Sequence, residues 1–375
     1  MDFDSIYISV NLQSKVEIMK NDASIEIDIV KASSSKITSV DFDNLPFGNV
    51  FTDHMMECDY ENGEWQSPKI RPYGPIQLEP SAKVLHYGQA VFEGMKAYRD
   101  EEDKIFMFRP KENFDRINKS AKRMAIPEFP EEYFFPALEE LLKLDKEWIK
   151  KGFGNSLYIR PFVIATEPGV QASPGKTYKF MIICSPAKSY YTGEVRVKFS
   201  EKYSRAADGG VGFAKAAGNY GAQFFPTNLA KEEGFQQMIW TDAHSHEFLE
   251  EAGTMNIFFR INETLVTAPT SDRILDGVTR KSIIQLAEAN GITVDVRKVP
   301  VKEILTAAQD GALKEIFGSG TAAVINPIQG FGYKGEKFEL QPASDSYALK
   351  LKDMLMKIQY NLAEDEFGWR YEVKE

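Results

Sequence analysis

Strand-like apolar segments alternate along this chain with segments that have the hydrophobic spacing of helices. This alternation limits the fold more than any other feature. Apolar segments at residues 156–166 and 178–184 have the length and composition of β-strands. The segment that Pro110 opens instead repeats its apolar residues every three or four positions, as an amphipathic helix does. Strands and helices in both halves predict α/β or α+β domains and exclude an all-helical chain and a TIM barrel.

The same patterns place most of the remaining elements. Hairpins are expected at residues 56–65 and 95–109, and further strands at 195–200 and around 247–268. Helical spacing extends over five segments, namely 110–124, 135–144, 220–233, 278–289 and 346–362.

The length of the chain predicts two domains. At 375 residues it exceeds what one hydrophobic core usually accommodates. A stretch near the middle contains Pro, Gly, Lys and paired Tyr without periodicity, as linkers do. We therefore predict a small N-terminal domain of residues 1–186, a linker of residues 187–197 and a large C-terminal domain of residues 198–375.

Charge and composition exclude several classes of protein. The formal net charge of -10 argues against nucleic acid as a partner, because phosphate binding needs clustered Lys and Arg. No apolar run approaches the roughly 20 residues that span a bilayer, and the N-terminus does not resemble a signal peptide. Cys58 and Cys184 are too few for a disulfide framework, and the four histidines form no metal pattern. We expect a cytoplasmic protein without a metal site or a membrane partner.

The segment GGVGFAKAAGNYG, residues 209–221, contains a candidate nucleophile. Lys215 stands among small residues, where desolvation lowers the pKa of an amine and makes it reactive toward an aldehyde. Tyr220 opens the next helix and can direct its hydroxyl back toward that amine. A surface lysine on a loop is the alternative interpretation.

A carboxylate and two phosphate-binding turns accompany this lysine. Glu251 precedes a turn and an apolar strand, a position that suits a buried cation such as a protonated pyridine nitrogen; a hairpin cap is the alternative. Val278 and Thr279 begin a helix whose free N–H groups favour an anion. Thr321 lies in the Gly-rich turn of residues 317–323, and Arg116 can pair with phosphate or simply lie at the surface.

The turn at residues 317–323 also matches Gly-x-Gly-x-x-Ala, a dinucleotide-binding pattern. Asn326-Pro327 and Gly330 leave little room for the long helix that such a site requires, so a nucleotide-dependent oxidoreductase is the weaker interpretation. Together, the amine, the carboxylate, the phenol and the phosphate-binding turns are what pyridoxal 5′-phosphate needs.

With these residues in place, the chain resembles the branched-chain amino-acid aminotransferases of the fold-type-IV pyridoxal-phosphate class. The resemblance runs from about Leu45 nearly to the C-terminus. It rests on six segments in the order and spacing of that family, namely FGNVFTDHM (47–55), LHYGQAVFEGMKAY (85–98), LYIRP (157–161), KAAGNYG (215–221), EAGTMN (251–256) and GSGTA (318–322).

The resemblance implies a two-domain fold with pyridoxal 5′-phosphate in the crevice between the domains. It implies that Lys215 bonds to the cofactor and moves the substrate α-proton, that Glu251 binds the ring nitrogen and that Tyr220 binds the phenolic oxygen. The phosphate ligands that it implies are Arg116, Val278, Thr279 and Thr321. The substrate pocket that it implies comprises Phe47, Tyr87, Phe92, Tyr158, Arg160, Thr254 and Ala322, with Thr254 and Ala322 near the substrate carboxylate and Arg160 near the second carboxylate of glutamate.

The implied activity is a ping-pong exchange between amino and oxo acids. Leucine, isoleucine or valine would give its amino group to 2-oxoglutarate, yielding a branched 2-oxo acid and glutamate. A homodimer is implied, with residues near Val170 reaching the partner's pocket. Two alternatives are another fold-type-IV enzyme, such as a D-amino-acid aminotransferase or aminodeoxychorismate lyase, and a non-catalytic protein of the same fold, which the presence of Lys215 and Glu251 disfavours.

Overall fold

The computed structural model describes residues 8–11, 15–20, 23–188, 193–341 and 343–374 of the chain. Over these residues the chain forms two compact units, Met1–Lys188 with Gly368–Glu375 and Ser189–Phe367. The predicted second domain ran to residue 375, but the structure assigns the last residues to the first unit, because a strand at Arg370–Val373 pairs with that unit's sheet. Residues 189–192 of the predicted linker lie outside the described residues.

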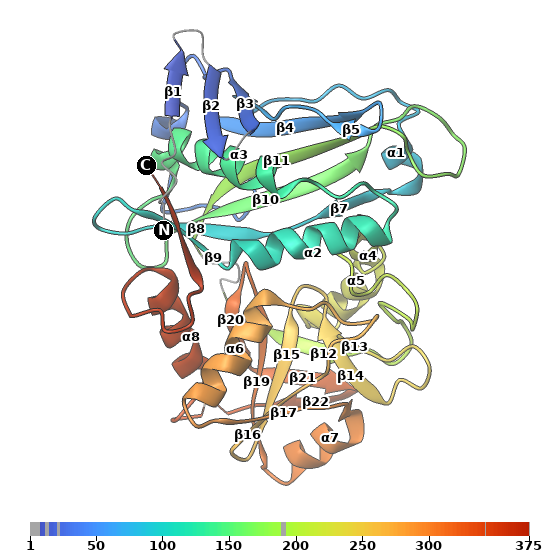
Figure 1. The fold of residues 1–375 in the computed structure, drawn as a ribbon. Helices are drawn as coiled ribbons and strands as arrows, with labels where there is room; N and C mark the ends of the chain where they lie inside the picture. The colour runs from blue at the N-terminus through green and yellow to red at the C-terminus, as the bar shows by residue number, and fades with distance from the viewer. Residues whose placement is uncertain (1–7, 12–14, 21–22, 189–192, 342, 375) are drawn as a thin grey trace. The chain divides into compact units, whose positions relative to one another are not determined.

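The first unit is built on one mixed sheet (Figure 1). Its path through the described residues runs β1-β2-β3-β6-β4-β11-β10-β8-β9-β23, with β5 beside β4 and β7 beside β10. Its strands are β1 (Ile8–Asn11), β2 (Lys15–Lys20), β3 (Ala23–Ile29), β4 (His54–Glu61), β5 (Glu64–Trp65), β6 (Lys69–Pro72), β7 (Ala90–Phe92), β8 (Met95–Arg99), β9 (Ile105–Phe108), β10 (Ser156–Ala165), β11 (Tyr178–Ala187) and β23 (Arg370–Val373). Its α-helices are α1 (Lys83–Tyr87), α2 (Pro110–Arg123) and α3 (Glu131–Leu144), with short 3₁₀ turns at Ile37–Ser39 and Lys146–Trp148.

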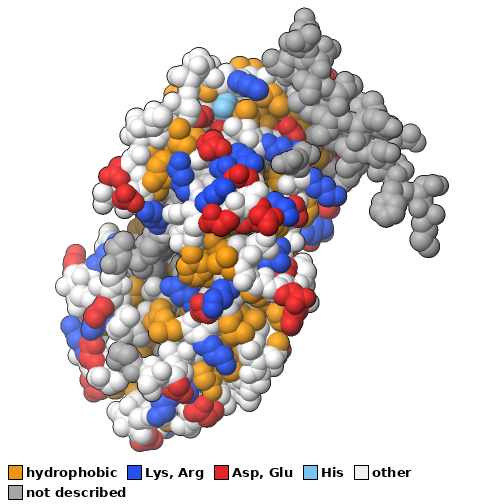
Figure 2. Space-filling model, turned by 90° about the vertical axis from the view of Figure 1, so that its left-hand side faces the viewer, with side chains coloured by type: hydrophobic (Ala, Val, Ile, Leu, Met, Phe, Trp, Pro, Cys, Tyr) orange, Lys and Arg blue, Asp and Glu red, His pale blue; other side chains and the backbone are white. Residues whose placement is uncertain are grey.

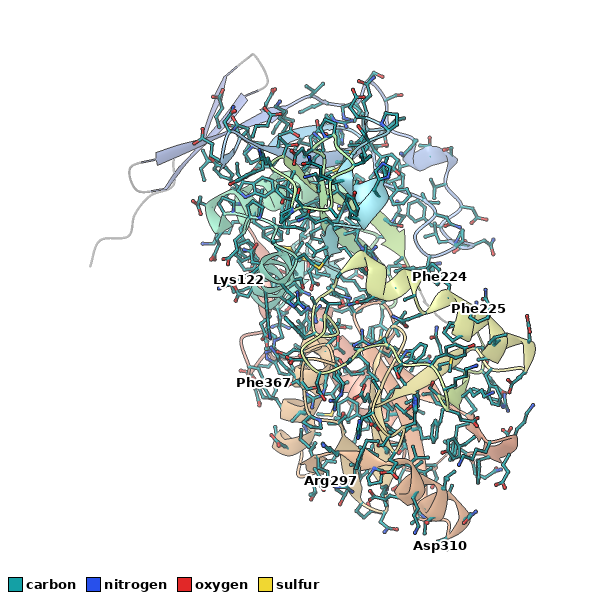
Figure 3. The ribbon with its side chains drawn as sticks, turned by 90° about the vertical axis from the view of Figure 1, so that its right-hand side faces the viewer. Lys122, Phe224, Phe225, Arg297, Asp310 and Phe367 are labelled. Atoms are coloured by element: carbon teal, nitrogen blue, oxygen red, sulfur yellow. The ribbon has the colours of Figure 1, made fainter. Side chains whose placement is uncertain are left out.

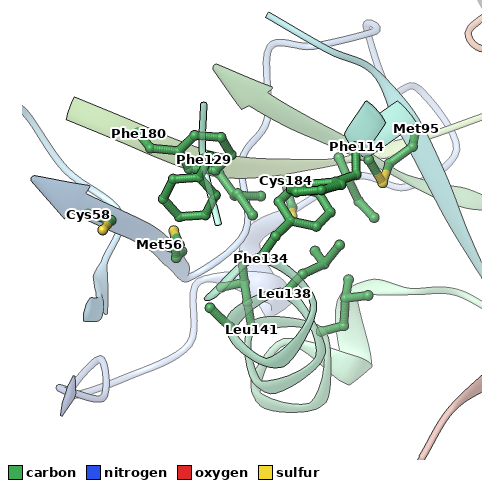
Figure 4. Close-up of a cluster of buried hydrophobic side chains, with 14 of the residues drawn as sticks. Met56, Cys58, Met95, Phe114, Phe129, Phe134, Leu138, Leu141, Phe180 and Cys184 are labelled. Atoms are coloured by element: carbon green, nitrogen blue, oxygen red, sulfur yellow. The ribbon is translucent and has the colours of Figure 1, made fainter. Parts of the chain in front are cut away.

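The core of the first unit lies between α3 and the sheet. Figure 4 shows Phe134, Leu138 and Leu141 of α3 directed toward side chains of the strands, among them Phe180. The helix expected at residues 135–144 is observed and begins earlier, at Glu131. Phe134 is fully buried, whereas Phe135 is only partly buried. The i, i+4, i+7 spacing that starts at residue 134 therefore faces the sheet.

The second unit contains a further mixed sheet, in the order β17-β16-β15-β14-β13-β12-β21-β22, with β18 beside β14, β19 beside β15 and β20 beside β19. Its strands are β12 (Arg196–Phe199), β13 (Gln237–Thr241), β14 (Phe248–Ala252), β15 (Asn256–Ile261), β16 (Thr264–Thr267), β17 (Thr293–Val296), β18 (Val299–Pro300), β19 (Leu313–Gly320), β20 (Val324–Ile328), β21 (Gly330–Tyr333) and β22 (Glu336–Glu339). Its helices are α4 (Ala217–Gly221), α5 (Phe224–Glu232), α6 (Val278–Ala289), α7 (Val301–Gln309) and α8 (Tyr347–Gln359).

The single helix expected at residues 220–233 is two helices. α4 ends at Gly221 and α5 starts at Phe224, with Pro226 in its first turn, where a proline is tolerated because no intrahelical N–H bond is required there. Phe224 and Phe225 open α5 with 67% and 63% of their surface exposed (Figure 3). The break places Tyr220 within the short helix that directly follows Lys215.

The surface carries both signs of charge. On the face drawn in Figure 2, Lys and Arg side chains are interspersed with Asp and Glu. Among the described residues, no helix is both long and apolar enough to traverse a lipid bilayer.

Candidate active site

Lys215 ends a tight loop, and its amine contacts the phenol of Tyr220. The Nζ atom of Lys215 donates to Oη of Tyr220 at 2.9 Å. α4 begins two residues after the lysine and turns Tyr220 back toward it. Asn219 anchors the loop, because its amide donates to the carbonyls of Val211 and Ala214 at 2.8 and 2.9 Å. The structure thus brings together the two residues that the sequence paired.

Glu251 is a buried carboxylate held by three partners. It is 5% exposed on β14. Oε1 pairs with Nη2 of Arg205 at 2.7 Å, and Oε2 accepts from the Asn256 amide at 2.9 Å and from the Leu275 N–H at 3.1 Å. Burial raises the pKa of Glu251 to about 7, although Arg205, the Leu275 N–H and Lys215 oppose the shift. The positive charge of Lys215 therefore favours the ionised form of Glu251, and this carboxylate can pair with a further cation.

The predicted phosphate-binding segments of the second unit lie around that carboxylate. α6 begins at Val278 after Gly277, and Val278 and Thr279 are 4% and 5% exposed. The first N–H groups of a helix have no intrahelical acceptor, so they favour an anion. The β19–β20 turn carries Thr321 and follows Ser319, which pairs in register with Asn256. Backbone pairing therefore joins the Thr321 turn to the strand that starts beside Glu251.

Thr254 and Ala322 lie in two turns of the second unit that approach each other. Thr254 is exposed between β14 and β15, and Ala322 is partly buried between β19 and β20. An added Cβ at Gly320 would lie 3.2 Å from the Thr254 carbonyl, so the two turns are in near contact. Their proximity agrees with the shared role that the resemblance implied for Thr254 and Ala322.

Arg116 lies in the first unit, on the buried face of α2, and is held by Glu93. Its Nε and Nη2 atoms lie 2.5 and 2.9 Å from the two carboxylate oxygens of Glu93, which is fully buried. Glu93 also accepts from the Asn113 amide and from the Gly94 N–H, both at 2.9 Å. The guanidinium is therefore fixed in place and is not a mobile surface charge.

Four of the predicted pocket residues meet in the first unit. The rings of Phe47 and Tyr158 pack edge to face with centroids 5.0 Å apart. The Arg160 guanidinium lies 4.7 Å from the Phe92 ring centroid and donates to Oη of Tyr158 at 2.8 Å. Nε of Arg160 is buried and has no hydrogen-bond partner among the described residues. An apolar wall with a partly buried guanidinium at its edge suits either a branched alkyl group or a carboxylate.

Tyr87 does not join that aromatic group through any described contact. It ends α1, is 42% exposed, and donates through its hydroxyl to the carbonyl of Val170. Val170 itself is 70% exposed. The contact fixes the loop at Val170 against α1.

Sequence reasoning missed four residues that hold the site together. Glu93 and Asn256 lie within the quoted segments FEGMKAY and EAGTMN, and Ser319 lies within GSGTA, but no role followed from their spacing. Arg205 lies outside every quoted segment, and only its place ten residues before Lys215 connects it with the site. Glu93, Asn256 and Arg205 act on other side chains, and Ser319 pairs through its main chain with Asn256. Such contacts are visible only in three dimensions.

Comparisons with known proteins agree with this geometry. The family model for amino-transferase class IV matches residues 90–331, which is well over half of the 375 residues. Branched-chain-amino-acid aminotransferase 2 of Bacillus subtilis is 43% identical over 349 residues, covering 92% of this chain and 96% of the relative. The branched-chain-amino-acid aminotransferase of Mycolicibacterium smegmatis is 43% identical over 338 residues, covering 87% and 91%.

Solved structures share the fold. The branched-chain amino acid aminotransferase of Escherichia coli superposes with a TM-score of 0.68 at 24% identity, covering 84% of this chain and 99% of the other. That of Thermobaculum terrenum, in its pyridoxal-phosphate form, gives a TM-score of 0.71 at 21% identity, covering 85% and 98%. The predictions of a fold-type-IV fold, a transaminase and pyridoxal 5′-phosphate as cofactor are confirmed at the level of the family. With a matching family model and relatives of 43% identity over nearly their whole length, this chain belongs to the class IV aminotransferases.

Proposed function

We propose that this protein is a branched-chain-amino-acid transaminase that uses pyridoxal 5′-phosphate to move the amino group of leucine, isoleucine or valine to 2-oxoglutarate. One observation carries the proposal: Lys215, paired with Tyr220 at 2.9 Å, is coupled electrostatically to the buried carboxylate of Glu251. The relatives at about 43% identity bear the name of this activity.

The residues of the second unit fit the cofactor. A protonated pyridine ring needs a buried anion, which Glu251 supplies, and a phosphate needs free N–H donors, which the start of α6 supplies. The Ser319 hydroxyl is buried without a hydrogen-bond partner among the described residues and leaves a polar atom to be satisfied beside this site. We propose that the second unit is the cofactor-binding domain.

The cofactor, when bound, supplies an electron sink that acidifies the α-hydrogen of an attached amino acid. Lys215 would hold the cofactor, and its amine would be the base that takes the substrate α-proton and returns it. Glu251, as a carboxylate, would hold the protonated ring nitrogen, and the Tyr220 hydroxyl would hold the phenolic oxygen. The Val278 and Thr279 amides and Thr321 would bind the phosphate, and the resemblance assigns a phosphate role to Arg116 as well.

The first unit supplies the substrate pocket in this proposal. Phe47, Phe92 and Tyr158 contact the branched side chain, and the guanidinium of Arg160 binds the second carboxylate of 2-oxoglutarate and glutamate. The resemblance assigns a place in the pocket wall to Tyr87 and the α-carboxylate to Thr254 and Ala322 of the second unit. One pocket thereby accepts both an apolar group and an anion.

The visible spectrum of the purified protein tests the activity. We expect a cofactor band that leucine bleaches and 2-oxoglutarate restores, and we expect Lys215→Ala to lack it. A wild-type protein that stays colourless with added pyridoxal 5′-phosphate would contradict the cofactor site. If leucine does not change the band, the branched-chain amino acids are not substrates.

The second carboxylate gives a separate test. Arg160→Met keeps an unbranched apolar stem but removes the charged guanidinium, so KM for 2-oxoglutarate should rise at least tenfold while KM for leucine changes little. Arg123→Met, an exposed change on the same unit, is the matched control. An equal rise for both substrates would place Arg160 outside the carboxylate site.

We further propose a homodimer that acts in the cytoplasm. Leu85 and Val170 of the first unit are 60% and 70% exposed, and the Tyr87 hydroxyl holds the Val170 loop beside α1. Both cysteines are free and buried, as suits a reducing compartment. Sedimentation should give twice the chain mass, and Val170→Asp should shift it toward the monomer, whereas Val30→Asp, also at an exposed valine, should not.

A further inference from the structure

One side chain of the second unit touches both parts of the candidate cofactor site. Asn256 begins β15, is 6% exposed, and lies opposite Glu251 on β14 and opposite Ser319 on β19. Its amide group has two hydrogens. One donates to Oε2 of Glu251 and the other to the carbonyl of Leu275, each at 2.9 Å.

These bonds close a ring with the main chain of Leu275. The Leu275 N–H donates to the same Oε2 atom of Glu251 at 3.1 Å. Leu275 therefore gives one bond to the carboxylate and receives one from Asn256. The turn at Leu275 cannot shift relative to Glu251 without breaking at least one of the three bonds.

The start of α6 depends on this ring. Gly277 is the N-cap of α6, two residues after Leu275, and it has an ordinary φ of −69°. A Cβ added to Gly277 would overlap the Asn256 amide oxygen and would lie 3.2 Å from Cβ of Arg280. The Asn256 amide therefore packs directly on the residue that begins the helix.

We propose that Asn256 is a positioning residue that couples the two ends of the cofactor site, so that Glu251 and the phosphate-binding start of α6 act as one preorganised unit. This inference rests on the proposed function, since it assigns the ring nitrogen to Glu251 and the phosphate to α6. Asn256 itself contacts neither end of the cofactor in this account. It sets the distance between the groups that do.

Two probes separate the two ends in the full-length apoprotein. Pyridoxal lacks the phosphate and reports the ring contacts, whereas the ratio of its Kd to that of pyridoxal 5′-phosphate reports the phosphate contacts. Binding is followed by calorimetry, which does not depend on turnover. Glu251→Gln should weaken pyridoxal binding with little change in the ratio, and Thr321→Ala, which removes a hydroxyl assigned to the phosphate, should lower the ratio with little change in pyridoxal binding.

Asn256→Ala should raise the Kd of pyridoxal and lower the ratio of the two Kd values, each by about tenfold. The reason is that two buried hydrogen bonds to different parts of the site are lost. Asn290→Ala is the matched control, since the Asn290 amide bonds only the Leu286 carbonyl at the other end of α6 in the described structure. Thermal melting of each apoprotein verifies folding, and Asn256→Ser replaces Asn256→Ala if the latter does not fold.

Gly277→Ala provides an independent route to the same displacement. It leaves the Asn256 amide in the chain but forces it out of place, so it should reproduce the Asn256→Ala phenotype. In the double variant the overlap with the amide is gone, and Gly277→Ala should add little to Asn256→Ala.

The inference is overturned if Asn256→Ala alters only the Kd of pyridoxal, only the ratio of the Kd values, or neither. It is also overturned if the effects of Asn256→Ala and Gly277→Ala add fully in the double variant. A wild-type apoprotein that binds neither pyridoxal 5′-phosphate nor pyridoxal would instead overturn the proposed function. The two failures are therefore distinguishable.

Discussion

At the scale of single residues, the buried carboxyl of Glu251 links stability to pH. Burial raises its pKa to about 7 from an ordinary value of 4.5. The folded apoprotein therefore holds this proton more tightly than the unfolded chain, and the stability that Glu251 contributes below pH 4.5 is lost as pH rises through 7.

This shift predicts a measurable difference between two apoproteins. From pH 4.5 to above pH 7, the free energy of unfolding of wild type should fall relative to Glu251→Gln by about 3 kcal/mol. Urea denaturation between pH 5 and 8 measures most of this change. Glu247→Gln, at an exposed residue, is the control and should follow wild type. A constant difference between wild type and Glu251→Gln would contradict the raised pKa.

Gly94 determines how closely Tyr158 approaches the main chain. A Cβ at Gly94 would overlap the Tyr158 hydroxyl, to which Arg160 donates. Gly94→Ala should therefore displace this pair, lower stability by about 1–3 kcal/mol and raise KM for 2-oxoglutarate. Gly74→Ala, at an open position, should do neither. Unchanged melting and kinetics in Gly94→Ala would show that Tyr158 tolerates the displacement.

The sequence was most informative about residues that carry chemistry themselves. Lys215 and Tyr220 are five positions apart, and a short helix between them is enough to bring their side chains together. Arg205 and Glu251 are 46 positions apart, as 251 − 205 shows, and their contact depends on how the loop that carries Arg205 packs against β14. A local pattern contains no information about such a contact, so the supporting residues could not be predicted.

At the scale of elements, α8 depends on a carboxylate from another element. Glu315 of β19 accepts from the N–H groups of Tyr347 and Ala348 at 2.8 and 3.1 Å, and from the Ser346 hydroxyl at 2.6 Å. It also pairs with the buried Arg260 at 3.1 Å. Glu315 thus caps the first turn of α8 and neutralises Arg260.

Removing this cap should be costly. Glu315→Ala leaves Arg260 and the first turn of α8 with fewer partners, and we expect a loss of about 3 kcal/mol in the free energy of unfolding. Glu263→Ala removes another partner of Arg260, but its side chain is 74% exposed, so the loss should be much smaller than for Glu315→Ala. Urea denaturation measures the free energy of unfolding of both variants. Equal losses in Glu315→Ala and Glu263→Ala would mean that burial of Glu315 does not matter.

Elements with clear terminal signals were predicted well. The helix expected at residues 278–289 has those bounds, because Gly277 precedes a regular run of apolar positions. Residues 220–233 also have helical spacing, but Gly221 and Pro226 divide them. β23 was not predicted, because a four-residue strand gains its stability from pairing with β9 and not from its own pattern.

At the scale of the whole molecule, the first unit is completed by residues from the end of the sequence. β23 pairs with β9, and Trp369 packs against Phe108 with ring centroids 5.6 Å apart. The Arg109 N–H donates to the Trp369 carbonyl at 2.8 Å. These contacts join residues that are 262 positions apart, as 370 − 108 shows for Arg370 and Phe108.

Truncation after Phe367 should therefore destabilise the first unit although it removes only the last eight residues (Phe367 is labelled in Figure 3). We expect amide hydrogens of β9 and β8 to exchange faster, while those of β14 and β15 in the second unit keep their protection. Hydrogen exchange followed by mass spectrometry resolves the two. Unchanged protection of β9 would show that β23 is dispensable.

The pairing of β9 with β23 also sets an order of events during synthesis. At roughly 5–20 residues per second, a ribosome needs roughly 10 to 50 s to make the stretch between the two strands. During that interval the nascent chain carries β9 as an unpaired edge whose four residues, Ile105–Phe108, are all buried in the finished unit. An mRNA with a premature stop codon before β23 would yield truncated chains in which this apolar edge stays exposed. Such chains are substrates for chaperones and proteases.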